Sequence, residues 1–186
     1  SASLVGSEMC IRDSSYTKKG CECLNSAYMT LDEVIDALQK GEEEGKKMVR
    51  LHTGDPSIYG AIREQMDRLE ELGIGYETCP GVTACFGAAA ALNLELTVPE
   101  VSQSLIITRM AGRTPVPEKE SIESFASHHA TMAVYLSAGH LKELSKRLMA
   151  GGYSEDTPAA IVYKATWPEQ LCLKCCLLYT SPSPRD

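Results

Sequence analysis

The chain alternates short apolar runs, which are typical of strands, with longer segments in which apolar residues recur every three or four positions. One segment of the second kind begins at Thr30, which stands with Glu33 at the separation of a capping box. Asp55 and Pro56 suit the start of a second helix, which Gly73 ends. The pattern predicts strands at 47–52, 74–79, 104–108, 131–136 and 158–163, and helices at 30–40, 56–72, 84–93, 121–129 and 137–150.

Strands and helices alternate throughout, so the predicted class is α/β with mostly parallel strands. A connector around Pro99, at residues 96–103, separates these elements into two groups. The prediction is therefore a first α/β domain at 15–98 and a second at 99–170. A length of 186 residues accommodates two small domains of this kind.

Composition indicates a globular, acidic protein. Hydrophobic residues make up 44% of the chain and charged residues 23%, which allows a sizeable core. The formal net charge is -7, whereas a nucleic-acid-binding protein usually has a basic face, so no nucleic-acid partner is expected. No apolar run reaches the roughly 18 residues of a membrane-spanning helix, so no membrane contact and a cytoplasmic location are expected.

Cysteine and histidine residues raise the question of a metal site. Cys172 and Cys175 have CxxC spacing, but no second CxxC and no paired histidines complete a zinc site, so no metal is expected. The adjacent His128 and His129 would point in different directions on a helix, which favours a surface position over shared metal binding.

Both ends of the chain resemble sequence that was not selected together with this protein. Residues 4–14 and 176–186 are similar to translations of one transposon sequencing adapter, read on opposite strands. We therefore assign 1–14 to the adapter and 171–186 to a junction and the adapter, and we expect both segments to pack poorly. On this interpretation the first domain lacks its N-terminal strand and loop, and the second lacks its C-terminal part.

Two strand–loop–helix junctions, 52–59 and 79–85, are candidate ligand sites, because ligands bind outside the carboxyl ends of strands in open α/β sheets. Gly54 and Gly81 allow a ligand to approach the backbone, and the amides at the following helix starts suit a carboxylate or ribose hydroxyls. Neither loop has the spacing of a dinucleotide fingerprint or a P-loop, so nucleotide hydrolysis has no support. Plain capped turns remain the alternative.

Three side chains are candidates for binding a substrate. His52 stands between a predicted strand and the Gly54 loop. Arg109 and Arg113 flank a glycine-containing loop, where they can bind carboxylates in a bidentate manner or simply be solvated.

At TGDPSIYG (53–60) together with PGVTA (80–84), the sequence resembles the tetrapyrrole methylase family. The stretches LTVPEVSQSLIITRMAGRTPVPEKES (96–121), ATMAVYLS (130–137) and IVYKATWPEQ (161–170) are similar to the branch that methylates precorrin-4 or cobalt-precorrin-4. The resemblance runs in order over nearly all of the segment between the two ends.

The resemblance implies two α/β domains with S-adenosylmethionine in the cleft between them, a homodimer in the full-length protein, and methyl transfer to carbon 11 of a tetrapyrrole in cobalamin biosynthesis. No catalytic side chain is assigned, because an activated methyl group needs mainly orientation and exclusion of water. Cofactor contacts carry over onto Gly54, Asp55, Ile58, Thr83, Ala84, Leu136 and Ala165.

Two other interpretations stay open. A family member with another acceptor, such as uroporphyrinogen, the diphthamide precursor or ribosomal RNA, would share both glycine loops, although the stretch 113–118 favours the precorrin-4 branch. The chain is alternatively a non-catalytic α/β nucleotide-binding module, which failure to bind S-adenosylmethionine would favour.

Overall fold

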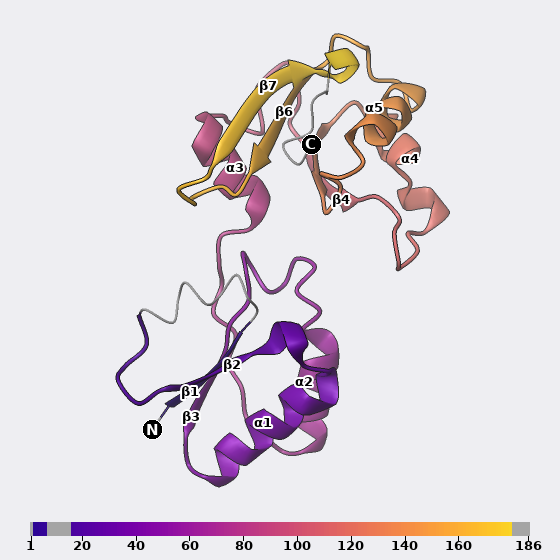
Figure 1. Ribbon diagram of the computed structural model, residues 1–186. Helices are drawn as coiled ribbons and strands as arrows, with labels where there is room; N and C mark the ends of the chain where they lie inside the picture. Colours follow the sequence, from indigo (N-terminus) through magenta and orange to yellow (C-terminus); the bar gives the residue numbers. More distant parts are fainter. Residues whose placement is uncertain (1, 7–15, 180–186) are drawn as a thin grey trace. The chain divides into compact units, whose positions relative to one another are not determined.

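The computed structural model describes residues 2–6 and 16–179, which fall into two compact units divided between Thr83 and Ala84 (Figure 1). The division comes before helix α3 (Ala84–Leu92), whereas the sequence predicted a boundary at 96–103. The difference has a physical reason, since the Cys85 amide at the start of α3 donates to the Tyr135 hydroxyl of the second unit at 2.8 Å.

The first unit is built on a parallel sheet of three strands in the order β2–β1–β3. Its central strand pairs from Ser3–Glu22 to Gly6–Asn25 on one side and from Ala2–Lys47 to Val5–Arg50 on the other. The strands are β1 (Ala2–Gly6), β2 (Glu22–Asn25) and β3 (Lys47–Arg50).

The structure contradicts the expectation that this sheet lacks a strand ahead of residue 15. Strand β1 lies between β2 and β3, whose backbone groups would otherwise have no ladder partner on their inner edges. Residues 4–6 therefore lie in a paired strand of the sheet. Residues 7–14, which carry most of the proposed N-terminal adapter segment, lie outside the described residues, and their adapter origin stays a prediction.

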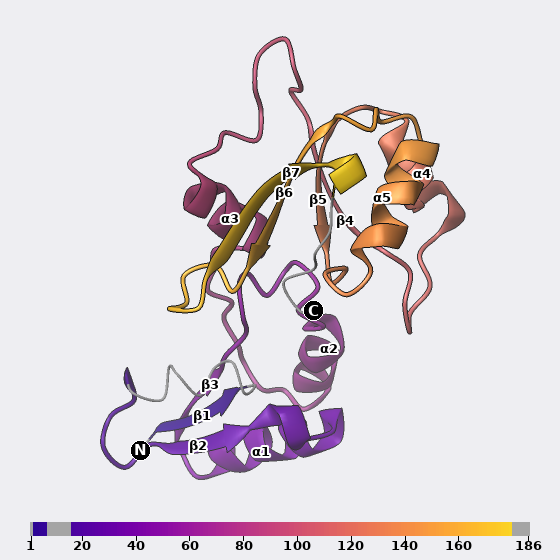
Figure 2. The same cartoon turned by 45° about the horizontal axis from the view of Figure 1, so that its top comes forward.

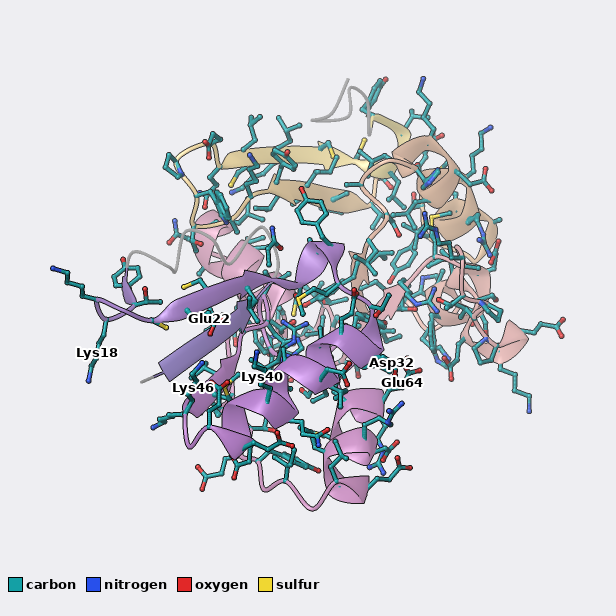
Figure 3. The ribbon with its side chains drawn as sticks, turned by 60° about the horizontal axis from the view of Figure 1, so that its bottom comes forward. Lys18, Glu22, Asp32, Lys40, Lys46 and Glu64 are labelled. Atoms are coloured by element: carbon teal, nitrogen blue, oxygen red, sulfur yellow. The ribbon has the colours of Figure 1, made fainter. Side chains whose placement is uncertain are left out.

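Helices α1 (Leu31–Glu43) and α2 (Arg63–Glu71) lie on one face of the sheet (Figure 1). The predicted capping box is confirmed, because the Thr30 amide donates to the Glu33 carboxylate at 2.6 Å and the Glu33 amide donates to the Thr30 hydroxyl at 3.3 Å. Arg68 of α2 lies 3.1 Å from Asp32 of α1, which is labelled in Figure 3. The buried core of this unit consists of Val34, Ile35, Leu38 and Leu69.

Two predicted elements of the first unit differ from the structure. The helix expected from Pro56 begins only at Arg63, because Tyr59 and Ala61 have φ angles of 56° and 50°, outside the helical region. Residues 74–79, predicted as a strand, have no strand conformation in the described structure. A short 3-10 helix, η2 (Ser26–Tyr28), precedes α1.

The second unit contains a parallel pair, β4–β5, and an antiparallel pair, β6–β7. Helices α4 and α5 lie side by side in both views (Figures 1 and 2), and they contribute Ile122, Ala126, Leu144 and Leu148 to the core. The predicted α/β class with mostly parallel pairing is confirmed, although β7 was not predicted. After α3, the elements are β4 (Leu105–Arg109), η3 (Glu118–Glu120), α4 (Ile122–Ala126), β5 (Thr131–Tyr135), α5 (Leu141–Ala150), β6 (Pro158–Tyr163), β7 (Leu171–Cys176) and η4 (Leu177–Tyr179).

The start of the predicted C-terminal adapter segment packs into the second unit. Leu177 is only 6% exposed and belongs to the core. Its carbonyl accepts a hydrogen bond from the Ser145 hydroxyl, and its amide donates to the Thr157 carbonyl at 3.1 Å. The expectation of poor packing is therefore wrong for Cys176, which ends β7, and for Leu177, whose side chain fills the core, whereas Leu178 and Tyr179 are exposed; residues 180–186 lie outside the described part.

The helix predicted at 137–150 begins only at Leu141, as α5. His140 occupies the N-cap position of that helix, and its side chain makes no capping hydrogen bond. The buried Ser137 hydroxyl instead donates to the Tyr135 carbonyl at 2.8 Å and accepts from the Met110 amide at 3.4 Å, so it links the ends of β5 and β4. Across the described residues, the helices are too short or too polar to traverse a bilayer.

Candidate functional site

The first glycine loop follows β3 directly and is organised by Asp55. The Asp55 carboxylate oxygen Oδ1 accepts hydrogen bonds from the Ser57 amide at 2.9 Å and from the Ser57 hydroxyl. The Asp55 carbonyl accepts from the Ile58 amide at 3.2 Å, which closes a turn. Gly54 has a φ of 68°, a backbone conformation that favours glycine. The loop is therefore a tight, internally bonded turn.

The second glycine loop lies against the first. The Gly81 amide donates to Asp55 Oδ2 at 2.8 Å. A Cβ atom on Gly81 would lie 2.1 Å from the Gly54 carbonyl oxygen, so the two loops meet backbone against backbone. The three hydrogen bonds to Asp55 lower the pKa of its carboxyl group, and the Ser57 hydroxyl has the largest effect. Asp55 is consequently ionised at neutral pH.

The other predicted cofactor residues of the first unit border these loops. Ile58 is half-buried, and Thr83 is buried with 6% of its surface exposed. The structure thus brings Gly54, Asp55, Ile58 and Thr83 into one region of the first unit, although the sequence places them in two separate segments.

His52, a candidate substrate residue, is half-buried between β3 and the first glycine loop. Burial lowers its pKa, and the charge of nearby Arg50 lowers it further. The imidazole is therefore neutral at pH 7, able to donate and accept a hydrogen bond but not to attract a carboxylate by charge.

The predicted residues of the second unit gather around the start of α3. The hydrogen bond from the Cys85 amide to the Tyr135 hydroxyl brings Ala84 close to the end of β5, where Leu136 is 81% exposed with a φ of 58°. Ala165 approaches the same helix, since a Cβ atom on Gly87 would lie 3.8 Å from the Ala165 Cβ. Ala84, Leu136 and Ala165 therefore border one region of the second unit.

The two candidate arginines have different surroundings. The Arg109 guanidinium donates to the carbonyl oxygens of Met110 at 3.2 Å, Thr114 at 3.1 Å and Pro115 at 3.1 Å. These bonds favour a role in bracing the loop after β4 over the predicted binding of a carboxylate. Arg113 lies exposed on the loop that Arg109 braces.

Ser57 and Tyr135 were missed as site residues by the sequence reasoning, and Gly81 was named there for its lack of a side chain but not as a partner of Asp55. Ser57 and Gly81 lie inside the two recognised motifs, so a search for side-chain and amide partners of Asp55 would have found them. Tyr135 carries no local signal, because its partner Cys85 is 50 residues away. No group of three or more His, Cys, Asp or Glu side chains suited to a metal ion occurs among the described residues.

The sequence profile of the tetrapyrrole (corrin/porphyrin) methylases matches residues 7–177, which include both glycine loops and most of each unit. The chain belongs to the tetrapyrrole methylase family. Among relatives of this tetrapyrrole methylase, the cobalt-precorrin-4 C(11)-methyltransferase of Methanocaldococcus jannaschii is 54% identical over 155 residues, covering 83% of this chain and 60% of the relative. The precorrin-4 C(11)-methyltransferase of Pseudomonas aeruginosa is 46% identical over 149 residues, covering 80% and 59% respectively.

Solved structures agree with this family. This tetrapyrrole methylase superposes on the X-ray structure of a cobalt-precorrin-4 methyltransferase of cobalamin biosynthesis with a TM-score of 0.91 and 42% identity, covering 95% of this chain and 74% of the other. A uroporphyrin-III C-methyltransferase from Thermus thermophilus shares the fold, with a TM-score of 0.76 and 19% identity over 95% of this chain and 72% of that one. The chain spans about 60% of the length of the curated relatives that it matches.

Proposed function

We propose that this chain supplies the S-adenosylmethionine-binding loops of a methyltransferase that acts on carbon 11 of precorrin-4 or cobalt-precorrin-4 in cobalamin biosynthesis. The observation that carries the proposal is the 54% identity with the Methanocaldococcus jannaschii enzyme of that name over 155 residues. The identity covers 83% of this chain, so it extends well beyond the short motifs that other methylases share.

The residues of the first unit fit the proposed cofactor. When bound, S-adenosylmethionine supplies a methyl group on a positively charged sulfonium. The glycine positions 54 and 81 expose backbone groups without side chains, which suits recognition of the polar parts of a small ligand. The ionised Asp55 adds negative charge beside them, which favours a cationic ligand. We propose Gly54, Asp55, Ile58 and Thr83 as cofactor residues here, and Ala84, Leu136 and Ala165 as those of the second unit.

The acceptor is a tetrapyrrole with several carboxylates, so the protein needs local cationic or amide groups to hold it. Arg113 is exposed, and its guanidinium can bind a carboxylate in a bidentate manner. His52 can contribute a hydrogen bond from its neutral ring. A homodimer and a cytoplasmic location are further parts of the proposal that rest on the resemblance alone.

A different acceptor is the alternative within the family. The S-adenosyl-L-methionine-dependent uroporphyrinogen III methyltransferase of Arabidopsis thaliana is 36% identical over 145 residues, a lower identity than the precorrin-4 enzymes show. The difference favours the precorrin-4 branch.

A methylation assay with three acceptors tests the proposal. Precorrin-4, cobalt-precorrin-4 and uroporphyrinogen III are each incubated with S-adenosylmethionine and the protein, both as the 186-residue chain and lengthened to the extent of its relatives. Gain of one methyl group at carbon 11 by either precorrin in the presence of the lengthened protein is the expected result. Methylation of uroporphyrinogen alone, or no binding of the cofactor by either form, would overturn it.

A further inference from the structure

One carboxylate joins the two glycine loops of the first unit. Asp55 Oδ1 accepts from the amide and the hydroxyl of Ser57, while Oδ2 accepts from the Gly81 amide at 2.8 Å. Gly81 lies 26 residues beyond Asp55, and α2 comes between them in the sequence. The carboxylate is therefore the polar link between loops that the chain connects only through a helix.

These hydrogen bonds occupy most of the accepting capacity of the carboxylate. An ionised carboxylate has about four acceptor positions, and Ser57 with Gly81 takes three of them. The two bonds from Ser57 hold Oδ1, which leaves Oδ2 directed at the second loop. Without the Ser57 hydroxyl, only the Ser57 and Gly81 amides would hold the carboxylate against rotation about its Cβ–Cγ bond, and such terminal torsions have broad energy minima.

The backbone contact makes the direction of the carboxylate important. Gly81 approaches the Gly54 carbonyl so closely that even a methyl group would collide with it, so a small rotation of either loop changes the surface that both present. Hydrogen bonds to charged groups are stronger than those between neutral groups, which suits Asp55 to hold this contact in one arrangement.

We propose that Ser57 is a positioning residue, which fixes the Asp55 carboxylate on the Gly81 amide and so holds the two glycine loops in the register that binds the cofactor. This inference takes the identity of the ligand from the proposed function, whereas its geometry rests only on the hydrogen bonds described above. The Gly81 amide is consequently a structural donor, and its hydrogen is not available to the cofactor.

The test combines a measurement on the free protein with one on the bound protein. The ¹H–¹⁵N spectrum of the 186-residue chain reports the Gly81 amide directly, and calorimetry measures the affinity for S-adenosylhomocysteine. In Ser57→Ala, the Gly81 resonance is expected to shift, its hydrogen exchange to accelerate, and the affinity to fall about tenfold. Ser57→Thr keeps the hydroxyl and is expected to restore all three.

A matched control is present in the second unit. The Ser154 hydroxyl donates to the Asp156 carboxylate, also two residues away, so Ser154→Ala removes an equivalent bond from a different loop. This control is expected to leave the Gly81 amide and the affinity unchanged. Equal losses in Ser154→Ala and Ser57→Ala would overturn the positioning role.

The remaining outcomes separate the inference from the proposed function. A Gly81 amide that does not respond to Ser57→Ala or to Asp55→Asn overturns the inference, while binding by the unaltered chain still supports the proposed function. If the Gly81 amide responds while the affinity for S-adenosylhomocysteine is unchanged, the hydrogen bond between Asp55 and Gly81 only supports the fold, and the inference is overturned. If the Gly81 amide responds but neither this chain nor the lengthened protein binds S-adenosylhomocysteine, the proposed function is overturned, and the positioning role with it.

Discussion

Substitution of Gly81 by alanine tests directly whether the two glycine loops depend on their backbone contact. The new Cβ would lie 2.1 Å from the Gly54 carbonyl oxygen, and Cβ atoms essentially never approach closer than 3.0 Å, so the loops must separate by about 0.9 Å. The obstruction is backbone and cannot rotate away as a side chain would. Added atoms in a tight contact typically cost about 1–3 kcal/mol of unfolding free energy.

The same movement strains the link to Asp55. A separation of about 0.9 Å directed along the 2.8 Å hydrogen bond from the Gly81 amide would take it beyond hydrogen-bonding distance. We therefore expect Gly81→Ala to weaken binding of S-adenosylhomocysteine at least about tenfold, a factor that corresponds to about 1.4 kcal/mol. Calorimetry at a temperature well below the unfolding transition measures this loss apart from the loss of stability.

Gly75→Ala is the matched control, because a Cβ atom at Gly75 meets no other atom within 4 Å and its φ is not in the left-handed region. It is expected to leave both the stability and the affinity unchanged. The reasoning is refuted if Gly81→Ala binds the ligand as tightly as the unaltered chain, or if the control loses as much affinity.

Four further predictions concern other parts of the molecule. Tyr135→Phe removes the acceptor of the buried Cys85 amide, so we expect a loss of about 1 kcal/mol in unfolding free energy, measured by urea denaturation. Ile35→Ala in the core of the first unit, where Ile35 is 1% exposed, should cost about 2–5 kcal/mol and lower the melting temperature of that unit, whereas Leu72→Ala at a 42% exposed position should have a small effect. The pKa of Asp55 is lowered below its usual 3.8, so its contribution to stability is fully present above pH 3.8 and is lost as the pH falls through the lower pKa of the folded protein. The chemical shift of the Gly81 amide should follow this titration, and Asp55→Asn should abolish the pH dependence of that shift. Since the chain spans about 60% of its curated relatives, we expect methyl transfer only from a protein of their full length, and turnover by the purified 186-residue chain would contradict this.

The sequence predicted those elements whose signals are local. The capping box at Thr30 and Glu33 placed the start of α1, and the apolar runs placed β3, β4, β5 and β6 to within a few residues. The helix expected from Pro56 was wrong because left-handed residues at 59 and 61 delay it, and those residues, Tyr59 and Ala61, are not types that signal such a conformation. Strand β1 was not predicted, because residues 1–14 were attributed to the sequencing adapter and were not considered for a strand pattern.

The candidate site was predictable only in part. Gly54, Asp55 and Thr83 were identified through two motifs, yet nothing local showed that Asp55 of one motif accepts a hydrogen bond from Gly81 of the other. Arg109 illustrates the opposite difficulty, since its position beside a loop suggested a ligand contact, whereas its guanidinium binds three carbonyls of its own chain. The partner of Asp55 lies 26 residues away, whereas the partners of Arg109 lie within six residues but are backbone carbonyls, which no pattern of side chains indicates.

The contact between Gly54 and Gly81 also constrains how this sequence can change over evolutionary time. Neither glycine can gain a side chain alone, since Gly54 has a positive φ and Gly81 has no space for a Cβ atom, so a substitution at one cannot readily be compensated at the other. The length of the stretch between them is less restricted, because closing a longer flexible loop costs only about 0.6 kcal/mol per doubling of its length, although Gly60 within it also has no space for a Cβ atom. Descendants of this chain should therefore retain the two glycine motifs as an inseparable pair while the distance between them along the sequence varies.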